Sequence, residues 1–129
     1  MTPILRILVV DDEASIRELL SRQLMRQGRK VLVAHDGRTA IEMFRRERPQ
    51  ITILDLNMPD MDGIAVLKEV RTVDPQASVI MLTGSGTEAL ERQARELGAT
   101  DFLAKGFSLH GLGQALKQVM NQPGRPASA

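Results

Sequence analysis

The chain has 129 residues, which is the size of one domain with a single core. Seventeen basic residues face 16 acidic ones, and this near balance excludes the strong field that nucleic acid or an anionic membrane would require. With three Phe as the only aromatic residues and no Cys, the composition also excludes a base-stacking platform, disulfides and thiolate metal sites.

The N-terminus lacks a signal-peptide pattern, and no apolar stretch approaches the roughly 20 residues that span a bilayer. We therefore expect a cytoplasmic protein without membrane contact. Five apolar runs rich in β-branched residues predict strands. They are continuous rather than alternating, which is typical of strands covered on both faces of a parallel sheet. The predicted strands are Leu5–Val10, Lys30–His35, Ile51–Leu54, Ser78–Leu82 and Asp101–Ala104.

Between and after these strands, apolar residues recur at spacings of three and four, which predicts five helices. Gly28 is placed to end the first helix, and Pro49 stops the second. Asp62 is the expected N-cap of the third helix, and Gly98 ends the fourth. The apolar stripes are Ile16, Leu19, Leu20 and Leu24; Ala40, Ile41 and Phe44; Ile64, Leu67, Val70 and Val73; Leu90, Ala94 and Leu97; and Leu109, Leu112, Leu116 and Val119.

Five strand–helix units in this length predict an α/β domain, doubly wound around a parallel sheet with right-handed crossovers. No internal boundary or repeat interrupts residues 1–121, so we expect one domain there. Residues 122–129 are rich in Pro, Gly and small side chains, which indicates a flexible tail or the start of a linker.

Acidic residues end two of the predicted strands. Asp11 and Asp12 follow the first strand, and Asp55 follows the third. In an open parallel sheet, the carboxyl ends of the strands face the ligand crevice, so these side chains are expected to meet there. Carboxylates that lie so close together repel each other, and they do not all ionise unless a cation binds between them. Mg2+ is the expected ion, because it prefers oxygen ligands.

Each polar residue at these strand ends also has an ordinary explanation. Asp12 could cap the first helix, with Glu13 favoured beside the positive end of the helix dipole, and Asp55 could be a turn residue. Thr83 could simply continue the fourth strand, and Lys105 could be a solvated surface lysine. Together, however, the acids, the hydroxyl and the amine are the parts that phosphoryl transfer to an aspartate requires.

Four segments carry a resemblance to a known family. They are LVVDDE (Leu8–Glu13), ILDLNMPDMDG (Ile53–Gly63), MLTG (Met81–Gly84) and DFLAK (Asp101–Lys105). In this order and spacing they resemble the receiver domains of two-component response regulators, over roughly residues 4–121. The resemblance implies a flavodoxin-like fold, with five parallel strands in the order 2-1-3-4-5.

The resemblance also implies a role for each acidic residue of the site. Asp55 would accept a phosphoryl group from a phosphohistidine of a histidine kinase or histidine phosphotransfer protein, or from a small acyl phosphate. Asp12 and Asp55 would ligate Mg2+, or alternatively Mn2+, directly, together with the backbone carbonyl of Asn57. Asp11 would act through a water molecule. The same metal and a water would later hydrolyse the aspartyl phosphate.

Thr83 and Lys105 would each bind an oxygen of the phosphoryl group, and Phe102 falls at the position of the family's switch aromatic. We expect Thr83 to move toward the phosphoryl group and Phe102 to enter the space that it leaves. This movement would alter the surface of the fourth helix, the fifth strand and the fifth helix, where an output domain or effector protein would bind. The family usually has Pro after the lysine; this chain has Gly106, which predicts a trans or mobile Lys105–Gly106 link.

These features predict a signalling module with slow phosphotransfer and autodephosphorylation activity rather than a metabolic enzyme. Two alternatives remain open from the sequence. One is a pseudo-receiver, an interaction module that is never phosphorylated. The other is a small Mg-dependent phosphohydrolase that uses aspartyl phosphate chemistry, for which 129 residues leave little room to build a substrate cap.

Overall fold

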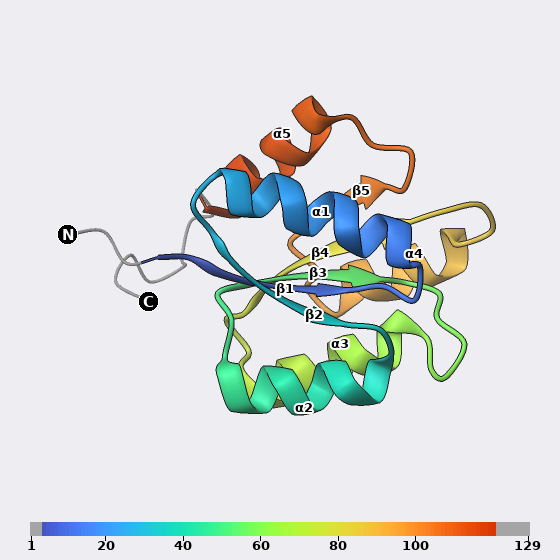
Figure 1. Cartoon of the computed structure of the whole chain (residues 1–129). Helices are drawn as coiled ribbons and strands as arrows, with labels where there is room; N and C mark the ends of the chain where they lie inside the picture. Colours follow the sequence, from blue (N-terminus) through green and yellow to red (C-terminus); the bar gives the residue numbers. More distant parts are fainter. Residues whose placement is uncertain (1–3, 121–129) are drawn as a thin grey trace.

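The computed structural model describes residues 4–120, which form a five-stranded parallel sheet between two layers of helices (Figure 1). The strands lie in the order β2-β1-β3-β4-β5, which is the order that the family resemblance implies. Within the described residues, the helices are too short or too polar to cross a bilayer. The elements in chain order are β1 (Arg6–Val10), α1 (Ala14–Arg26), β2 (Lys30–Ala34), α2 (Gly37–Glu47), β3 (Ile51–Asp55), α3 (Gly63–Val73), β4 (Ser78–Thr83), α4 (Glu88–Glu96), β5 (Asp101–Ala104) and α5 (Leu109–Met120).

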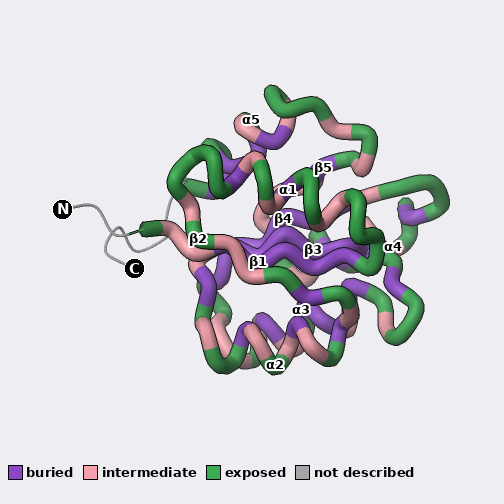
Figure 2. Tube along the Cα trace, in the orientation of Figure 1, coloured by how far each residue is buried: buried purple, intermediate pink, exposed green. Residues whose placement is uncertain are grey.

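The sheet has one core on each face. Helices α1 and α5 cover one face, whereas α2, α3 and α4 cover the other. Along β1, Ile7 and Val9 belong to the first core, and Leu8 and Val10 belong to the second. All four are 0–1% exposed, and the central strands form the buried middle of the molecule in Figure 2. The continuous hydrophobic run in the sequence therefore reflects a strand buried on both faces.

The strand ends that matter for the site agree with the predicted ones to within one residue. Asp55 is the last residue of β3, and Thr83 is the last residue of β4. Strand β1 begins at Arg6 and β2 ends at Ala34, each one residue short of the predicted strand. Chain order changes direction between β1 and β3, and their carboxyl ends therefore open onto the crevice where such sheets bind ligands.

The helix ends follow the local signals in the sequence. Gly28 adopts φ +79° just beyond α1, a left-handed conformation that glycine adopts without strain. Asp62 caps α3, because its carboxylate accepts a hydrogen bond from the Ala65 N–H at 2.9 Å. Two residues of the predicted apolar stripes are exposed rather than buried: Leu19 is 39% exposed and Leu109 is 56% exposed. Leu20 already fills the buried face of α1 beside Leu19, and Leu109 is the first residue of α5.

The C-terminal end of α4 is fastened to its neighbours by one side chain. Arg71, on α3, donates hydrogen bonds to the carbonyl oxygens of Leu97 (3.0 Å), Ala77 (2.6 Å) and Gly98. Burial lowers the pKa of Arg71, and the charge of Asp74 partly offsets this shift. Arg71 therefore satisfies carbonyl groups at the end of α4 that have no partner inside the helix.

Candidate functional site

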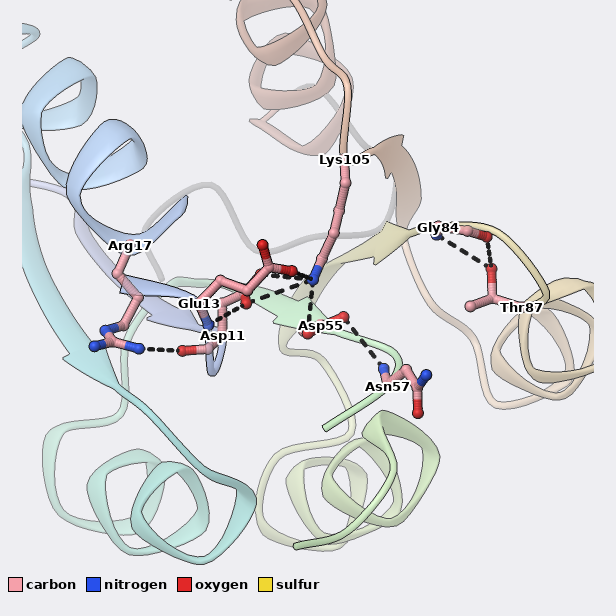
Figure 3. A network of polar contacts seen from close by, with 8 residues as sticks. All are labelled: Asp11, Glu13, Arg17, Asp55, Asn57, Gly84, Thr87 and Lys105. Atoms are coloured by element: carbon pink, nitrogen blue, oxygen red, sulfur yellow. Dashed lines mark hydrogen bonds and ion pairs between the residues drawn. The ribbon is translucent and has the colours of Figure 1, made fainter. Parts of the chain in front are cut away.

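The three predicted metal-binding carboxylates converge at the carboxyl end of the sheet. Asp11 directly follows β1, and Asp55 ends β3 beside it (Figure 3). One carboxylate oxygen from each of Asp11, Asp12 and Asp55 lies within 4.8 Å of the other two. Asp11 is 0% exposed and Asp55 is 2% exposed, whereas Asp12 is exposed. The cluster therefore has a buried floor and one side chain open to solvent.

Asp55 is a buried carboxylate with two hydrogen-bond donors. Its Oδ1 accepts from the backbone N–H of Asn57 at 3.2 Å, and its Oδ2 accepts from Lys105 Nζ at 3.0 Å. Burial raises the pKa of Asp55 to about 6; the bonds from Asn57 and Lys105 oppose that shift, and the charge of Asp11 adds to it. At neutral pH the carboxyl group is still mostly ionised, as a nucleophile must be.

Asp11 has an oxygen that suits a cation. Its Oδ1 accepts the backbone N–H of Glu13 at 2.9 Å, but within the described residues its buried Oδ2 accepts no hydrogen bond. The nearest cation to Oδ2 is Lys105 Nζ, at 3.4 Å. Burial raises the pKa of Asp11, although the Glu13 N–H bond works against this. Three carboxylates with one unsatisfied buried oxygen fit a hard divalent ion such as Mg2+.

Asn57 lies in the loop after β3. Its backbone N–H bonds to Asp55, and Asn57 forms an isolated antiparallel bridge with Asp62. The loop is narrow, since a Cβ on Gly63 would lie 2.4 Å from the carbonyl oxygen of Asp55. Glycine is therefore required at position 63, and the backbone of Asn57 is held close to the carboxylate cluster.

Lys105 directly follows β5, and its ammonium group contacts three carboxylates of the site. Nζ lies 2.7 Å from Glu13 Oε1, 3.0 Å from Asp55 Oδ2 and 3.4 Å from Asp11 Oδ2. Burial alone would lower the pKa of Lys105, but the bonds to Glu13 and Asp55 outweigh burial and the pKa is raised. Lys105 therefore stays protonated and positively charged at neutral pH. Residues 4–120 contain no cis peptide bond, so the Lys105–Gly106 link is trans, the first of the two predicted alternatives.

Glu13 is a member of this cluster that the sequence did not assign to it. It is the N-cap residue of α1, so the alternative in which Asp12 caps the helix is wrong. Within the described chain, the Glu13 side chain accepts no capping hydrogen bond and instead binds Lys105, 92 residues away. Only the acidic run Asp11–Glu13 hinted at this contact, since local sequence does not reveal a distant partner.

Thr83 is the last residue of β4, and Phe102 lies on the neighbouring strand β5. The Thr83 carbonyl accepts the backbone N–H of Lys105 at 2.8 Å. Phe102 pairs with Met81, two residues before Thr83, and is half-buried against the core beneath α4. The guanidinium carbon of Arg95 lies 4.4 Å from the centroid of the Phe102 ring. The predicted switch aromatic is therefore covered by a cation from α4.

An open hollow of about 590 Å³ lies beside Lys105. The loop that borders it is closed by Thr87, a buried residue without a predicted role. The Thr87 hydroxyl donates to the Gly84 carbonyl at 2.7 Å (Figure 3). It also lies 3.0 Å from Glu91 Oε2, so two acceptors compete for one proton. The hollow is lined by Thr83, Gly84, Ser85, Ala104, Lys105 and Gly106.

Comparison with known proteins agrees with this geometry. Residues 7–117 match the family model of the response regulator receiver domain. The chain is 35% identical over 117 residues to the chemotaxis protein CheY of Bacillus subtilis, covering 90% of this chain and 98% of that protein. It is 39% identical over 122 residues to the probable transcriptional regulator ycf27 of Guillardia theta, covering 95% of this chain and 48% of the relative.

A solved structure of the chemotaxis protein CheY4 of Vibrio cholerae matches with a TM-score of 0.84 and 33% identity, covering 91% of this chain and 99% of that one. The chain thus spans about half the length of the ycf27 relatives but nearly all of the chemotaxis proteins. Receiver domains bind Mg2+ through acidic residues and interact with kinases and output domains. This chain belongs to the receiver domains of two-component response regulators.

Proposed function

We propose that Asp55 accepts a phosphoryl group from a phosphohistidine of a histidine kinase or histidine phosphotransfer protein. The observation that carries this proposal is the environment of Asp55: a buried, ionisable carboxylate 3.0 Å from a fixed ammonium group and beside an unsatisfied oxygen of Asp11. In the transfer, an Asp55 oxygen forms the new O–P bond as the P–N bond of the phosphohistidine breaks. The donor imidazole keeps the electron pair of that bond.

Asp11, Asp12 and Asp55 are the residues that would hold Mg2+, or Mn2+ in its place, with the backbone carbonyl of Asn57 as a further ligand. Such an ion supplies positive charge that offsets the repulsion between the Asp55 carboxylate and the incoming phosphoryl group. Lys105 supplies a second positive charge, 3.0 Å from Asp55 Oδ2. Its N–H and the hydroxyl of Thr83 would each bind a phosphoryl oxygen.

The signal would leave the site through Thr83 and Phe102. We infer that Thr83 moves toward the bound phosphoryl group and that Phe102 turns inward, altering the α4–β5–α5 surface. An effector protein or an output domain would read that surface. The length of the ycf27 relatives supports an attached domain, and the length of the chemotaxis relatives supports a separate effector.

The proposed receiver unit runs over residues 1–121, and residues 122–129, which lie outside the described part of the chain, would serve as a tail or linker. We propose a cytoplasmic location, where kinases of this class act on receiver domains. Neither alternative function is favoured by the comparisons, because the chain matches receiver domains along nearly its whole length.

Intact-mass spectrometry after incubation with acetyl phosphate and Mg2+ tests the proposal. The wild-type protein is expected to gain one phosphoryl adduct, and Asp55→Asn is expected to gain none. EDTA should abolish the adduct in the wild type. A stable adduct on Asp55→Asn, or no adduct on the wild type with either acetyl phosphate or a phosphorylated histidine kinase, would contradict a phosphoacceptor role for Asp55.

A further inference from the structure

The ammonium group of Lys105 is fully engaged before any phosphoryl group arrives. An ammonium has three N–H donors, and three carboxylates surround this one. The shortest contact joins Nζ to Glu13 Oε1 at 2.7 Å, shorter than the 3.0 Å contact with the phosphoacceptor Asp55 (Figure 3). The residue that holds the lysine most closely is therefore Glu13, which has no assigned part in the reaction.

Glu13 presents its carboxylate from a fixed stretch of backbone. Its N–H donates to Asp11 Oδ1 at 2.9 Å, and its carbonyl accepts the N–H of Arg17 at 3.1 Å as the first hydrogen bond of α1. Arg17 also donates from Nη1 to the backbone carbonyl of Asp11 at 2.8 Å, which secures the same turn. The Glu13 side chain consequently begins from a point that is constrained on both sides.

The Lys105 side chain is much less constrained than its backbone, whose N–H is held by the Thr83 carbonyl at 2.8 Å. Lys105 is followed by Gly106, and apart from Gly106 and its two chain neighbours no described residue has an atom within 4 Å of the place where a Cβ would stand there. The lysine side chain itself carries four flexible methylene groups. Where the ammonium lies therefore depends chiefly on the groups that bind it, and the closest of those groups is the Glu13 carboxylate.

We propose that Glu13 is a positioning residue for phosphoryl transfer. It holds the Lys105 ammonium at the site so that one N–H donates to Asp55. That N–H can then donate instead to an oxygen of the phosphoryl group bound to Asp55. The Glu13 contact persists while the Asp55 contact is exchanged. The inference depends on the proposed role of Asp55 as phosphoacceptor.

A double-mutant cycle tests whether Glu13 acts through Lys105. The variants are Glu13→Ala, Glu13→Gln, Lys105→Ala and the double variant Glu13→Ala/Lys105→Ala, each phosphorylated with saturating acetyl phosphate and Mg2+. Glu13→Ala should slow phosphorylation about tenfold, because a misplaced ammonium no longer meets the transferred group. Glu13→Gln keeps an oxygen acceptor and should lose only about threefold. The double variant should match Lys105→Ala within about twofold.

Glu18→Gln is the matched control, since Glu18 is an exposed residue on the same helix, and it should behave as the wild type. A second measurement needs neither metal nor phosphate. In EDTA, the ζ-ammonium signal of Lys105 in nitrogen-15 NMR should be sharp and slow to exchange in the wild type and in Glu18→Gln. It should broaden in Glu13→Ala, while thermal denaturation verifies that each variant is folded.

Several results would overturn the inference. Acceleration by both Glu13→Ala and Glu13→Gln would mean that Glu13 acts only through its negative charge. If the double variant is phosphorylated more slowly than Lys105→Ala alone, Glu13 acts independently of the lysine. A tenfold loss of Mg2+ affinity in Glu13→Ala would make it a metal ligand. If Asp55→Asn is inert while Glu13→Ala equals the wild type, only the inference fails; an adduct on Asp55→Asn removes the proposed function itself.

Discussion

Replacing Asp55 with Asn should stabilise the metal-free protein at neutral pH. The carboxylate is 2% exposed, and burial raises its pKa from an ordinary 3.8 to about 6. One pKa unit corresponds to about 1.4 kcal/mol between the two protonation states, so keeping Asp55 ionised costs the folded state about 3 kcal/mol. Asn has nearly the same shape and carries no charge, and it still offers Lys105 an oxygen.

The sign of the pH dependence follows from the direction of this shift. Because the pKa of Asp55 is higher in the folded state, the folded protein binds this proton more tightly than the unfolded chain does. The resulting stabilisation of the wild type is present below about pH 4 and is lost as the pH rises through about 6. The Asn variant does not titrate at this position. Its advantage over the wild type should therefore grow by about 2.4 kcal/mol from pH 4 to pH 7.

Urea denaturation in EDTA across this pH range measures the difference. A difference in free energy of unfolding between Asp55→Asn and the wild type that stays constant, or becomes smaller as the pH rises, would refute the argument. Asp36→Asn is an informative control, because the Thr39 N–H bond lowers the pKa of Asp36 and the shift has the opposite sign. The stability that Asp36 contributes is lost as the pH falls through its lowered pKa, so Asp36→Asn should show no growing advantage between pH 4 and pH 7.

Three further substitutions test other contacts. Phe44→Ala removes a core ring that is 1% exposed and should lower the free energy of unfolding by about 3–5 kcal/mol in urea. Asp60→Ala removes the carboxylate that accepts the Gly37 N–H at 3.0 Å; it should cost about 1 kcal/mol and speed hydrogen exchange at that amide. Arg95→Ala uncovers Phe102 and should tighten binding of beryllofluoride, a phosphoryl mimic, about two- to fivefold by calorimetry, whereas unchanged binding would show that Arg95 does not restrain the ring.

The strands and the acidic cluster could be predicted because each depends on local or repeated features of the sequence. A strand that is buried on both faces must be apolar at every position, so Ile51–Asp55 is recognisable without its neighbours. A parallel sheet then brings the strand ends together, which is why Asp11 and Asp55 were expected to meet. The order of the strands came from the family resemblance rather than from periodicity.

Contacts between side chains from remote elements could not be predicted in the same way. The Glu13–Lys105 contact joins residues 92 positions apart, and nothing near Glu13 distinguishes it from an ordinary residue at a helix start. The spacing of Leu19 fits a helical stripe, but Leu19 is exposed, because the angular position of the buried face depends on how α1 lies on the sheet.

The anchoring of α4 by Arg71 determines how that helix can move. Its last turn is held to α3, while the segment before its first turn contains Gly84 and Gly86. Any displacement that starts at Thr83 must therefore become a tilt about a pivot at Leu97 rather than a sliding of the whole helix. The nine residues of α4 make a lever about 13 Å long, so a shift of about 1 Å at its free end turns the axis by only about 4°.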